Sequence, residues 1–324
     1  MKLYSYNNEK KLGYSIKQAE AGAYPWEFPS YYLAFRSPHD SGITKNDSAF
    51  CEIITPQGLD KPLKLLIFLH GFSTKRTKME NYYHFINSIA AKGYTCALLN
   101  LPFHLNRTPD NSCSGEDLIY FDDMQTLEFF HQCVVDTRRL IDIMQNYKLD
   151  RIYICGLSMG SMVSVLAMAH EPRIQKGILL IGGGHWEELH WNGILRFILK
   201  GNCADEGKID RKRCHAYYSS FPVFLKHLKK TAPGTIDTNN LGPLDVHLAK
   251  KCFLCDPISF AHRISRERIL MVNARFDLYF SKRSTLNLWK ELGMPQIHWL
   301  CNFHSSKIIT DESVKEIIYN FLEK

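Results

Sequence analysis

The sequence predicts an α/β fold with a mainly parallel sheet and helices on both faces. Short apolar runs, typical of strands buried on both faces, alternate along the chain with longer segments of helical periodicity. This alternation continues to the C-terminus, and repeated strand and helix units of this kind form parallel sheets. The chain has 324 residues, of which 45% are hydrophobic, so it can bury the core of a large domain.

The N-terminal residues 1–62 carry the weakest pattern. Two stretches, at 31–36 and 48–55, have the composition of strands and are separated by polar turn residues. We interpret them as entry strands of the sheet, within an N-terminal extension of the core.

Two strand predictions follow. The first is the apolar run Leu65–Leu69, which ends in His70-Gly71-Phe72 and leads into a helix that Gly93 ends. The second, at 94–99, leads into a loop of about twenty residues that contains His104 and Arg107. Loops of that length in a compact domain are usually functional or mobile.

The next units are a helix over 124–147, a strand over 152–155 and a helix over 161–170. Between the last two lies Gly156-Leu157-Ser158-Met159-Gly160. A G-x-S-x-G sequence between a strand and a helix can hold a serine on a strained turn with its hydroxyl exposed. It therefore proposes Ser158 as a nucleophile, although the same pentapeptide fits an ordinary turn with a capping serine.

After a strand at 177–181 the alternation lapses until residue 268. We predict that 185–267 form an inserted cap and that 1–184 together with 268–324 form the core. A strand at 269–272 then precedes Asp277, a strand at 297–301 precedes His304, and a last amphipathic helix follows.

These motifs together resemble the α/β-hydrolase superfamily. The resemblance rests on His70-Gly71 after one core strand, on Gly156 to Gly160 after a later one, and on an acid and a histidine that follow in that order. It runs from Lys64 to the C-terminus, with the cap unmatched. The chain is most similar to the esterase, dienelactone-hydrolase-like and prolyl-oligopeptidase-like group, with Ser158 in place of the cysteine nucleophile of dienelactone hydrolases.

The resemblance implies a catalytic triad of Ser158, Asp277 and His304. His304 would take the serine proton and return it to the leaving group, while Asp277 orients the imidazole. The backbone N–H groups of Phe72 and Met159 would receive the charge that develops on the substrate carbonyl oxygen. The expected activity is cleavage of a carboxylic ester or thioester, and the alternatives are an acyltransferase, a peptidase or a non-catalytic binding protein of this fold.

Other residues compete for two of these roles. For the base, His298 lies inside the last strand, and His70 is interpreted as a structural histidine that shapes the oxyanion loop. For the acid, Asp245 and Asp256 lie in the cap and suit turns or helix caps.

Substrate-binding candidates lie in the long loop and the cap. His104 and Arg107 follow a strand at the same sheet edge as Ser158, and Arg107 could bind a substrate carboxylate or phosphate. The alternative is that Arg107 pairs with Asp110 or Glu116 to stiffen the loop. His185 and Trp186 are further candidates. The cap aromatics are expected to pack against the core, with a few lining an apolar acyl pocket: Trp186, Trp191, Phe197, Tyr217, Tyr218, Phe221 and Phe224.

Charge and cysteine content exclude some classes. The formal charge of +7 arises from short, dispersed basic clusters, and no nucleic-acid-binding motif accompanies them. We find no signal peptide or membrane-spanning segment, so we expect a cytoplasmic protein with reduced thiols and a small-molecule acyl substrate. Because the cap residues Cys203, Cys214, His215, Cys252 and Cys255 lack the regular spacing of a structural zinc site, no metal or cofactor is expected. The sequence makes no prediction of an oligomeric state.

Overall fold

A computed structural model describes residues 1–6, 13–20, 22, 25–201, 203, 207–208, 210–231, 236–237 and 250–324. Its strands form a nine-stranded sheet in the order β1-β2-β3-β5-β4-β6-β7-β8-β9. The strands are β1 (Tyr14–Gln18), β2 (Ser30–Arg36), β3 (Ser48–Ile54), β4 (Leu63–Leu69), β5 (Thr95–Leu99), β6 (Leu149–Leu157), β7 (Lys176–Leu180), β8 (Ile269–Phe276) and β9 (Gln296–Phe303). The six strands from β5 to β9 in this order pair in parallel, which confirms the predicted fold class.

The N-terminal strands extend one edge of the sheet. β1, β2 and β3 pair as antiparallel neighbours, and β3 joins β5, with Cys51 opposite Leu99. The short connections between these strands suit antiparallel pairing, whereas a parallel pair needs a longer crossover. The stretches 31–36 and 48–55, interpreted from the sequence as strands, correspond to β2 and β3.

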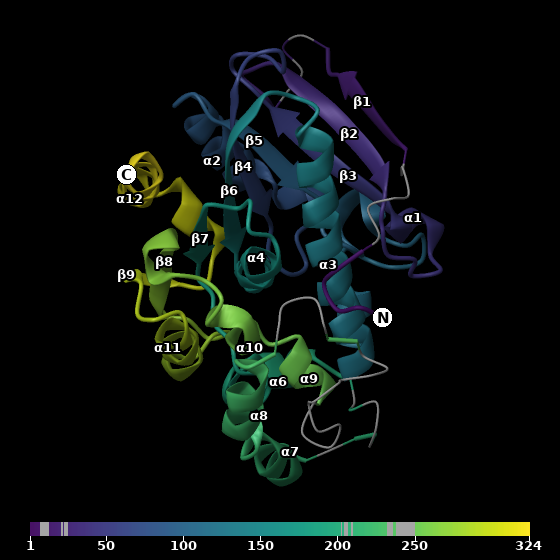
Figure 1. The fold of residues 1–324 in the computed structure, drawn as a ribbon, viewed down its shortest axis with the longest axis vertical. Helices are drawn as coiled ribbons and strands as arrows, with labels where there is room; N and C mark the ends of the chain where they lie inside the picture. Colours follow the sequence, from purple (N-terminus) through teal and green to yellow (C-terminus); the bar gives the residue numbers. More distant parts are fainter. Residues whose placement is uncertain are drawn as a thin grey trace.

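Helices cover both faces of the sheet, as the alternating burial of β4 shows. Leu65, Ile67 and Leu69 belong to one apolar cluster, and Leu66 and Phe68 belong to the other. The first cluster includes side chains of α3 (Asp123–Met144), α4 (Met159–His170) and α11 (Lys282–Glu291), and the second includes those of α2 (Glu80–Ala90) and α12 (Glu312–Glu323). Figure 1 shows α3 and α4 in front of the sheet. A short α1 (Thr44–Asp47) precedes β3.

The described part of the segment between β7 and β8 contains several short helices. They are α5 (Trp186–Asn192), α6 (Leu195–Ile198), α7 (Arg211–Tyr218), α8 (Phe221–Leu228), α9 (Lys251–Leu254) and α10 (Pro257–Ala261). Figure 1 shows α6 to α9 gathered at one end of the molecule, beyond the sheet. α10 differs from them because it packs on α4 and α11, next to the sheet.

An aromatic cluster holds this helical segment together. The rings of Tyr218, Phe221 and Phe224 lie 4.7–5.3 Å from the ring of Phe253, and all four side chains are buried. Phe197, in contrast, is 71% exposed, so the expectation that it packs against the core is wrong. Within the described residues, every helix is too short or too polar to cross a bilayer.

Candidate active site

Ser158 lies on the turn between β6 and α4 in a strained backbone conformation. Its φ is 57° and its ψ is −117°, a combination that non-glycine residues rarely adopt. A Cβ atom on Gly156 would lie 2.1 Å from the carbonyl oxygen of Gly160, and one on Gly160 would lie 2.2 Å from that of Leu69. Because these contacts are with backbone atoms, only glycine fits at either position. The turn therefore has the geometry that presents a serine hydroxyl above the sheet.

The side chains of Ser158, His304 and Asp277 form a hydrogen-bonded chain. Nε2 of His304 lies 2.9 Å from Oγ of Ser158, and its Nδ1 lies 2.8 Å from Oδ2 of Asp277. A carboxylate can only accept, so Nδ1 carries the proton and Nε2 is free to accept the serine proton. Asp277 follows β8 and His304 follows β9, so the carboxyl ends of the parallel strands bring the three residues together.

Backbone donors and aromatic rings fix the Asp277 and His304 side chains. Oδ1 of Asp277 accepts hydrogen bonds from the N–H groups of Tyr279 and Phe280, each at 2.8 Å. The rings of Tyr279 and Phe280 lie 4.5 and 5.7 Å from the His304 ring. One carboxylate oxygen is therefore held by the loop, and the other is left for the imidazole.

The predicted oxyanion donors belong to residues that line the same pocket as Ser158 and His304. Met159 opens α4, where the first N–H groups of a helix have no acceptor within it. Phe72 follows Gly71, where a Cβ atom would lie 3.4 Å from the Ser158 Cβ, so this loop passes beside the serine. Both backbone segments therefore lie beside the serine.

Two buried histidines hold the loop that contains Phe72. Nδ1–H of His70 donates to the Gly71 carbonyl at 2.9 Å, and its Nε2 accepts from the Leu101 N–H. Nε2 of His104 accepts from the Ser73 N–H at 3.2 Å. Burial lowers the pKa of His70 to about 4 and that of His104 to about 3, so both rings are neutral. His70 thus agrees with its interpretation as a structural residue. The prediction that His104 binds substrate is wrong, because its ring is fully buried behind the loop.

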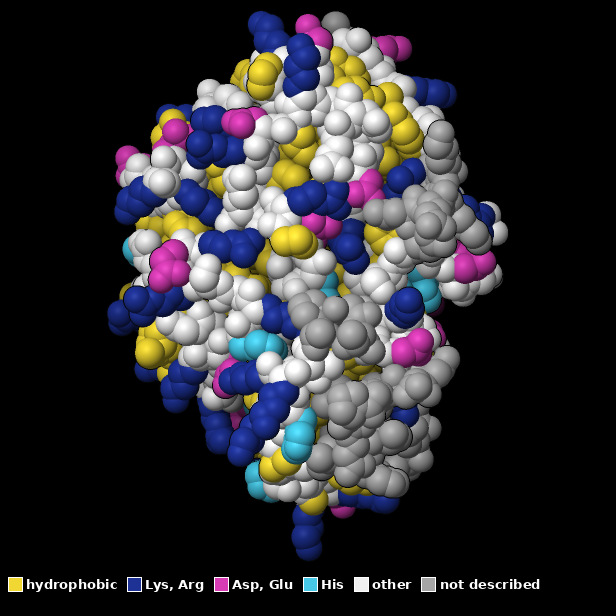
Figure 2. Space-filling model, in the orientation of Figure 1, with side chains coloured by type: hydrophobic (Ala, Val, Ile, Leu, Met, Phe, Trp, Pro, Cys, Tyr) yellow, Lys and Arg dark blue, Asp and Glu magenta, His cyan; other side chains and the backbone are white. Residues whose placement is uncertain are grey.

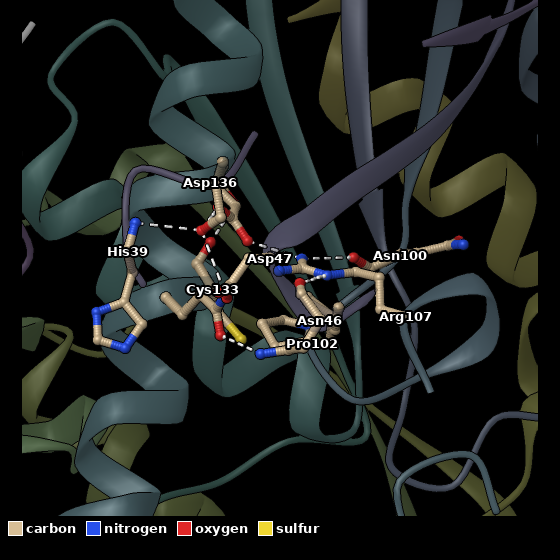
Figure 3. A network of polar contacts seen from close by, with 12 residues as sticks. His39, Asn46, Asp47, Asn100, Pro102, Arg107, Cys133 and Asp136 are labelled. Carbon is tan, nitrogen blue, oxygen red and sulfur yellow. Dashed lines mark hydrogen bonds and ion pairs between the residues drawn. The ribbon is translucent and has the colours of Figure 1, made fainter. Parts of the chain in front are cut away.

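Arg107 also lies away from the pocket, in a buried polar network (Figure 3). Its guanidinium pairs with Asp136 of α3 at 2.7 Å and donates to the backbone carbonyls of Asn46 and Asn100. Both members of the ion pair are at most 1% exposed. The prediction that Arg107 grips an anionic substrate is therefore wrong.

The alternative prediction, that Arg107 pairs with Asp110 or Glu116, is also wrong. Asp110 pairs with Lys45 instead, and Glu116 accepts from the Cys113 N–H. Arg107 does stiffen the loop, but it does so by anchoring it to α3.

The two candidates at the start of α5 differ in position. Trp186 lines the pocket, whereas the His185 ring packs on Tyr218 and Phe221 and is absent from the lining. The N–H groups of both residues donate to the Asp256 carboxylate, at 3.1 and 2.9 Å. The His185 side chain therefore has a structural position, contrary to its prediction as a substrate contact.

The competing acids and bases lie elsewhere. Asp256 caps α10, as expected of an aspartate before a proline, and His298 lies within β9, hydrogen-bonded to Gln296. Asp245 lies outside the described residues. Among the described residues, no three His, Cys, Asp or Glu side chains are placed to bind a metal ion.

The site opens into a cavity of about 850 Å³. Several residues that line this cavity were not predicted from the sequence. They include Met162 of α4, Phe129 and Phe130 of α3, and Leu189 of α5. Helical spacing identified α3, but it did not show which side of the helix faces the cavity. The position of Met162, one turn after Ser158, could have signalled its place beside the nucleophile.

Lys and Arg side chains are dispersed over the face seen in Figure 2, with several over α8 and α11. This distribution resembles the scattered basic clusters of the sequence.

Comparisons with known proteins agree with this fold. The family model of the alpha/beta hydrolase fold matches residues 64–300. Acetyl xylan esterases from Paenibacillus sp. R4 and from Thermoanaerobacterium sp. JW/SL YS485 are similar in structure, with TM-scores of 0.61 and 0.60. Their sequences are 15% and 16% identical to this chain, and the alignments cover 98% and 99% of it and 90% and 89% of theirs.

A third similar structure is an acylaminoacyl peptidase from Pyrococcus horikoshii, with a TM-score of 0.56 and 13% identity. The alignment covers 98% of this chain but 42% of the peptidase. A search of curated proteins found no match. At these identities the similar structures show the fold alone.

Proposed function

The chain belongs to the alpha/beta hydrolase fold family, and we propose that it is a serine hydrolase that cleaves a carboxylic ester or thioester through an acyl-enzyme on Ser158. The observation that carries the proposal is the chain of hydrogen bonds from Asp277 through His304 to a serine on a strained turn. Acetyl xylan esterases have the same fold, which is consistent with ester cleavage.

The reaction begins with attack of the Ser158 Oγ on the substrate carbonyl carbon. His304 Nε2 takes the serine proton, and Asp277 stabilises the imidazolium that forms. The N–H groups of Phe72 and Met159 receive the negative charge on the carbonyl oxygen, and losing one such donor typically costs about 3–4 kcal/mol.

The tetrahedral intermediate then collapses. His304 gives its proton to the leaving alcohol or thiol, and the acyl group stays on Ser158. Water, deprotonated by His304, attacks the acyl-enzyme and releases the acid.

We also propose that residues 185–267 act as a cap that shapes the substrate site. Trp186, Leu189 and Tyr218, which line the cavity beside Ser158, come from this segment. A cytoplasmic location is consistent with ten cysteines that are all free, because a reducing compartment keeps thiols unpaired.

A fluorophosphonate probe tests the proposed function, since it reacts only with an activated serine. We expect the wild-type protein to be labelled and the Ser158→Ala and His304→Ala variants to remain unlabelled. Ser161→Ala is the matched control, because Ser161 lies one turn further along α4, where its hydroxyl donates to the Ser158 carbonyl. Absence of labelling in a folded wild-type protein would favour a non-catalytic binding protein.

Transfer to an added alcohol separates a hydrolase from an acyltransferase. We expect the acid to remain the main product in the presence of the alcohol. A main product that carries the added alcohol would assign the acyltransferase alternative, and cleavage confined to amides would assign the peptidase.

A further inference from the structure

We propose that the substrate is an ester or thioester of a long-chain fatty acid, and that its acyl chain lies in the cavity between α3, α5, α7 and α9. This inference rests on the proposed function, because it places the chain relative to the acyl-enzyme on Ser158. The proposed acyl chain is much longer than the acetyl group that appears in the names of two similar structures.

The walls of the cavity are suited to an apolar chain. Most of the side chains that these four helices bring to it are apolar, aromatic or thiol groups, among them Phe129, Phe130, Trp186, Leu189, Tyr218 and Cys252. Burial raises the pKa of the thiols of Cys214 and Cys252, so both line the cavity as neutral groups. The carboxylate of Glu187, which also borders the cavity, lies 2.7 Å from the His215 ring.

The size of the cavity also favours a long chain. A methylene group has about the volume of a water molecule, roughly 30 Å³ in the liquid, so twelve to sixteen carbons would fill roughly 350–500 Å³. The cavity measures about 850 Å³. An acetyl group would fill less than about a tenth of it and leave most of the apolar wall in contact with water.

The position of His304 indicates which part of the substrate enters the cavity. His304 protonates the leaving group, so the leaving oxygen must lie beside its ring. The neighbours of the acid and the base in sequence, Leu278 and Phe303, are 62% and 66% exposed, so this side of the site faces solvent. The leaving group therefore departs toward solvent, and the acyl chain extends past Met159 and Met162 toward α5 and α7.

Two matched ester series test the placement. The first is p-nitrophenyl esters from acetate to palmitate, all in the same detergent, and the second is acetate esters of alcohols of increasing length. Burial of each methylene can raise kcat/KM up to about fourfold. We expect kcat/KM to rise at least about 100-fold from acetate to decanoate in the acyl series and to change less than about fivefold in the alcohol series.

A cavity-filling variant locates the chain. Cys214 lies on α7 and lines the cavity, so Cys214→Phe is expected to lower the ratio of kcat/KM for the palmitate ester to kcat/KM for the acetate ester at least about tenfold. Circular dichroism and labelling of Ser158 by the fluorophosphonate show whether the variant is folded. Cys113→Phe is the control, because Cys113 is exposed and outside the cavity, and it should leave the profile unchanged.

The outcomes separate this inference from the proposed function. A profile that is flat or highest for acetate, in a protein labelled at Ser158, would overturn the long-chain substrate and leave the hydrolase intact. A rise confined to the alcohol series would place the cavity on the leaving-group side and overturn the assignment of the acyl chain. A long-chain preference that Cys214→Phe does not alter would refute the path past α7. Failure of both labelling and cleavage would refute the hydrolase itself.

Discussion

Replacement of Arg107 by methionine tests whether this residue is structural. The substitution leaves the Asp136 carboxylate, which is 1% exposed, without its ionic partner, and breaking such a buried pair typically costs about 3–5 kcal/mol. It also removes the hydrogen bonds to the carbonyls of Asn46 and Asn100, each worth about 1 kcal/mol. We therefore expect a loss of about 5–7 kcal/mol in the free energy of unfolding, a large part of the stability of an ordinary domain.

Urea unfolding followed by circular dichroism measures this loss, and the labelling rate of the folded variant measures the site. The double variant Arg107→Met/Asp136→Leu should regain at least half of the lost stability, because it removes the unpaired charge and replaces the pair with apolar side chains. Labelling of Ser158 in the folded single variant should stay within about twofold of wild type. An Arg107→Met variant with unchanged stability but much lower kcat/KM would refute this reasoning. It would indicate that Arg107 contacts the substrate.

Three further predictions concern the loop, the turn and the buried histidines. His104→Ala should lower kcat for a p-nitrophenyl ester about tenfold with little change in KM, because it releases the Ser73 N–H that positions the loop; a raised KM alone would instead indicate substrate contact. Gly160→Ala should abolish fluorophosphonate labelling, because the new methyl would meet a backbone oxygen at 2.2 Å, whereas Gly13→Ala, with open space around its Cβ position, should be labelled normally. Burial lowers the pKa of four histidines far below the value near 6.5 of the unfolded chain, so the unfolded state binds protons that the folded state does not as the pH falls from 6.5 toward 4. Each such histidine contributes about 1.3 kcal/mol, so the free energy of unfolding should be about 5 kcal/mol lower at pH 5.5 than at pH 7.5. Equal values at the two pH values would contradict the burial of the four rings, which are those of His70, His104, His131 and His170.

The strands and the proposed triad could be read from the sequence because each depends on local patterns. A buried strand is a short apolar run, and a residue that follows it lies at the edge where parallel strands end. Ser158, Asp277 and His304 each follow such a run. Their proximity could therefore be predicted on one further assumption, that the three strands are parallel and lie near one another in the sheet.

The roles of Arg107 and the cavity walls could not be read in this way. The partner of Arg107 is Asp136, in the middle of a helix whose other charged residues are partly exposed, and nothing in the spacing of the two residues predicts their pairing. A residue that follows a strand can face the pocket or lie buried behind it, and its position in the sequence does not distinguish the two cases. The distinction depends on which carbonyls and carboxylates of distant segments surround the side chain.

The contrast between Asp277 and Asp256 shows how the same residue type comes to serve different purposes. Oδ1 of Asp256 accepts from the N–H groups of His185 and Ile258, and Oδ2 accepts from that of Trp186, so both oxygens are occupied by backbone donors. Asp256 thereby joins the start of α5 to the start of α10 and is fully buried. Asp277 accepts two backbone hydrogen bonds through Oδ1 alone, and its Oδ2 is left for His304. An acid that orients a catalytic base must be fixed by its surroundings and still have an acceptor to offer, and of these two aspartates only Asp277 meets both conditions.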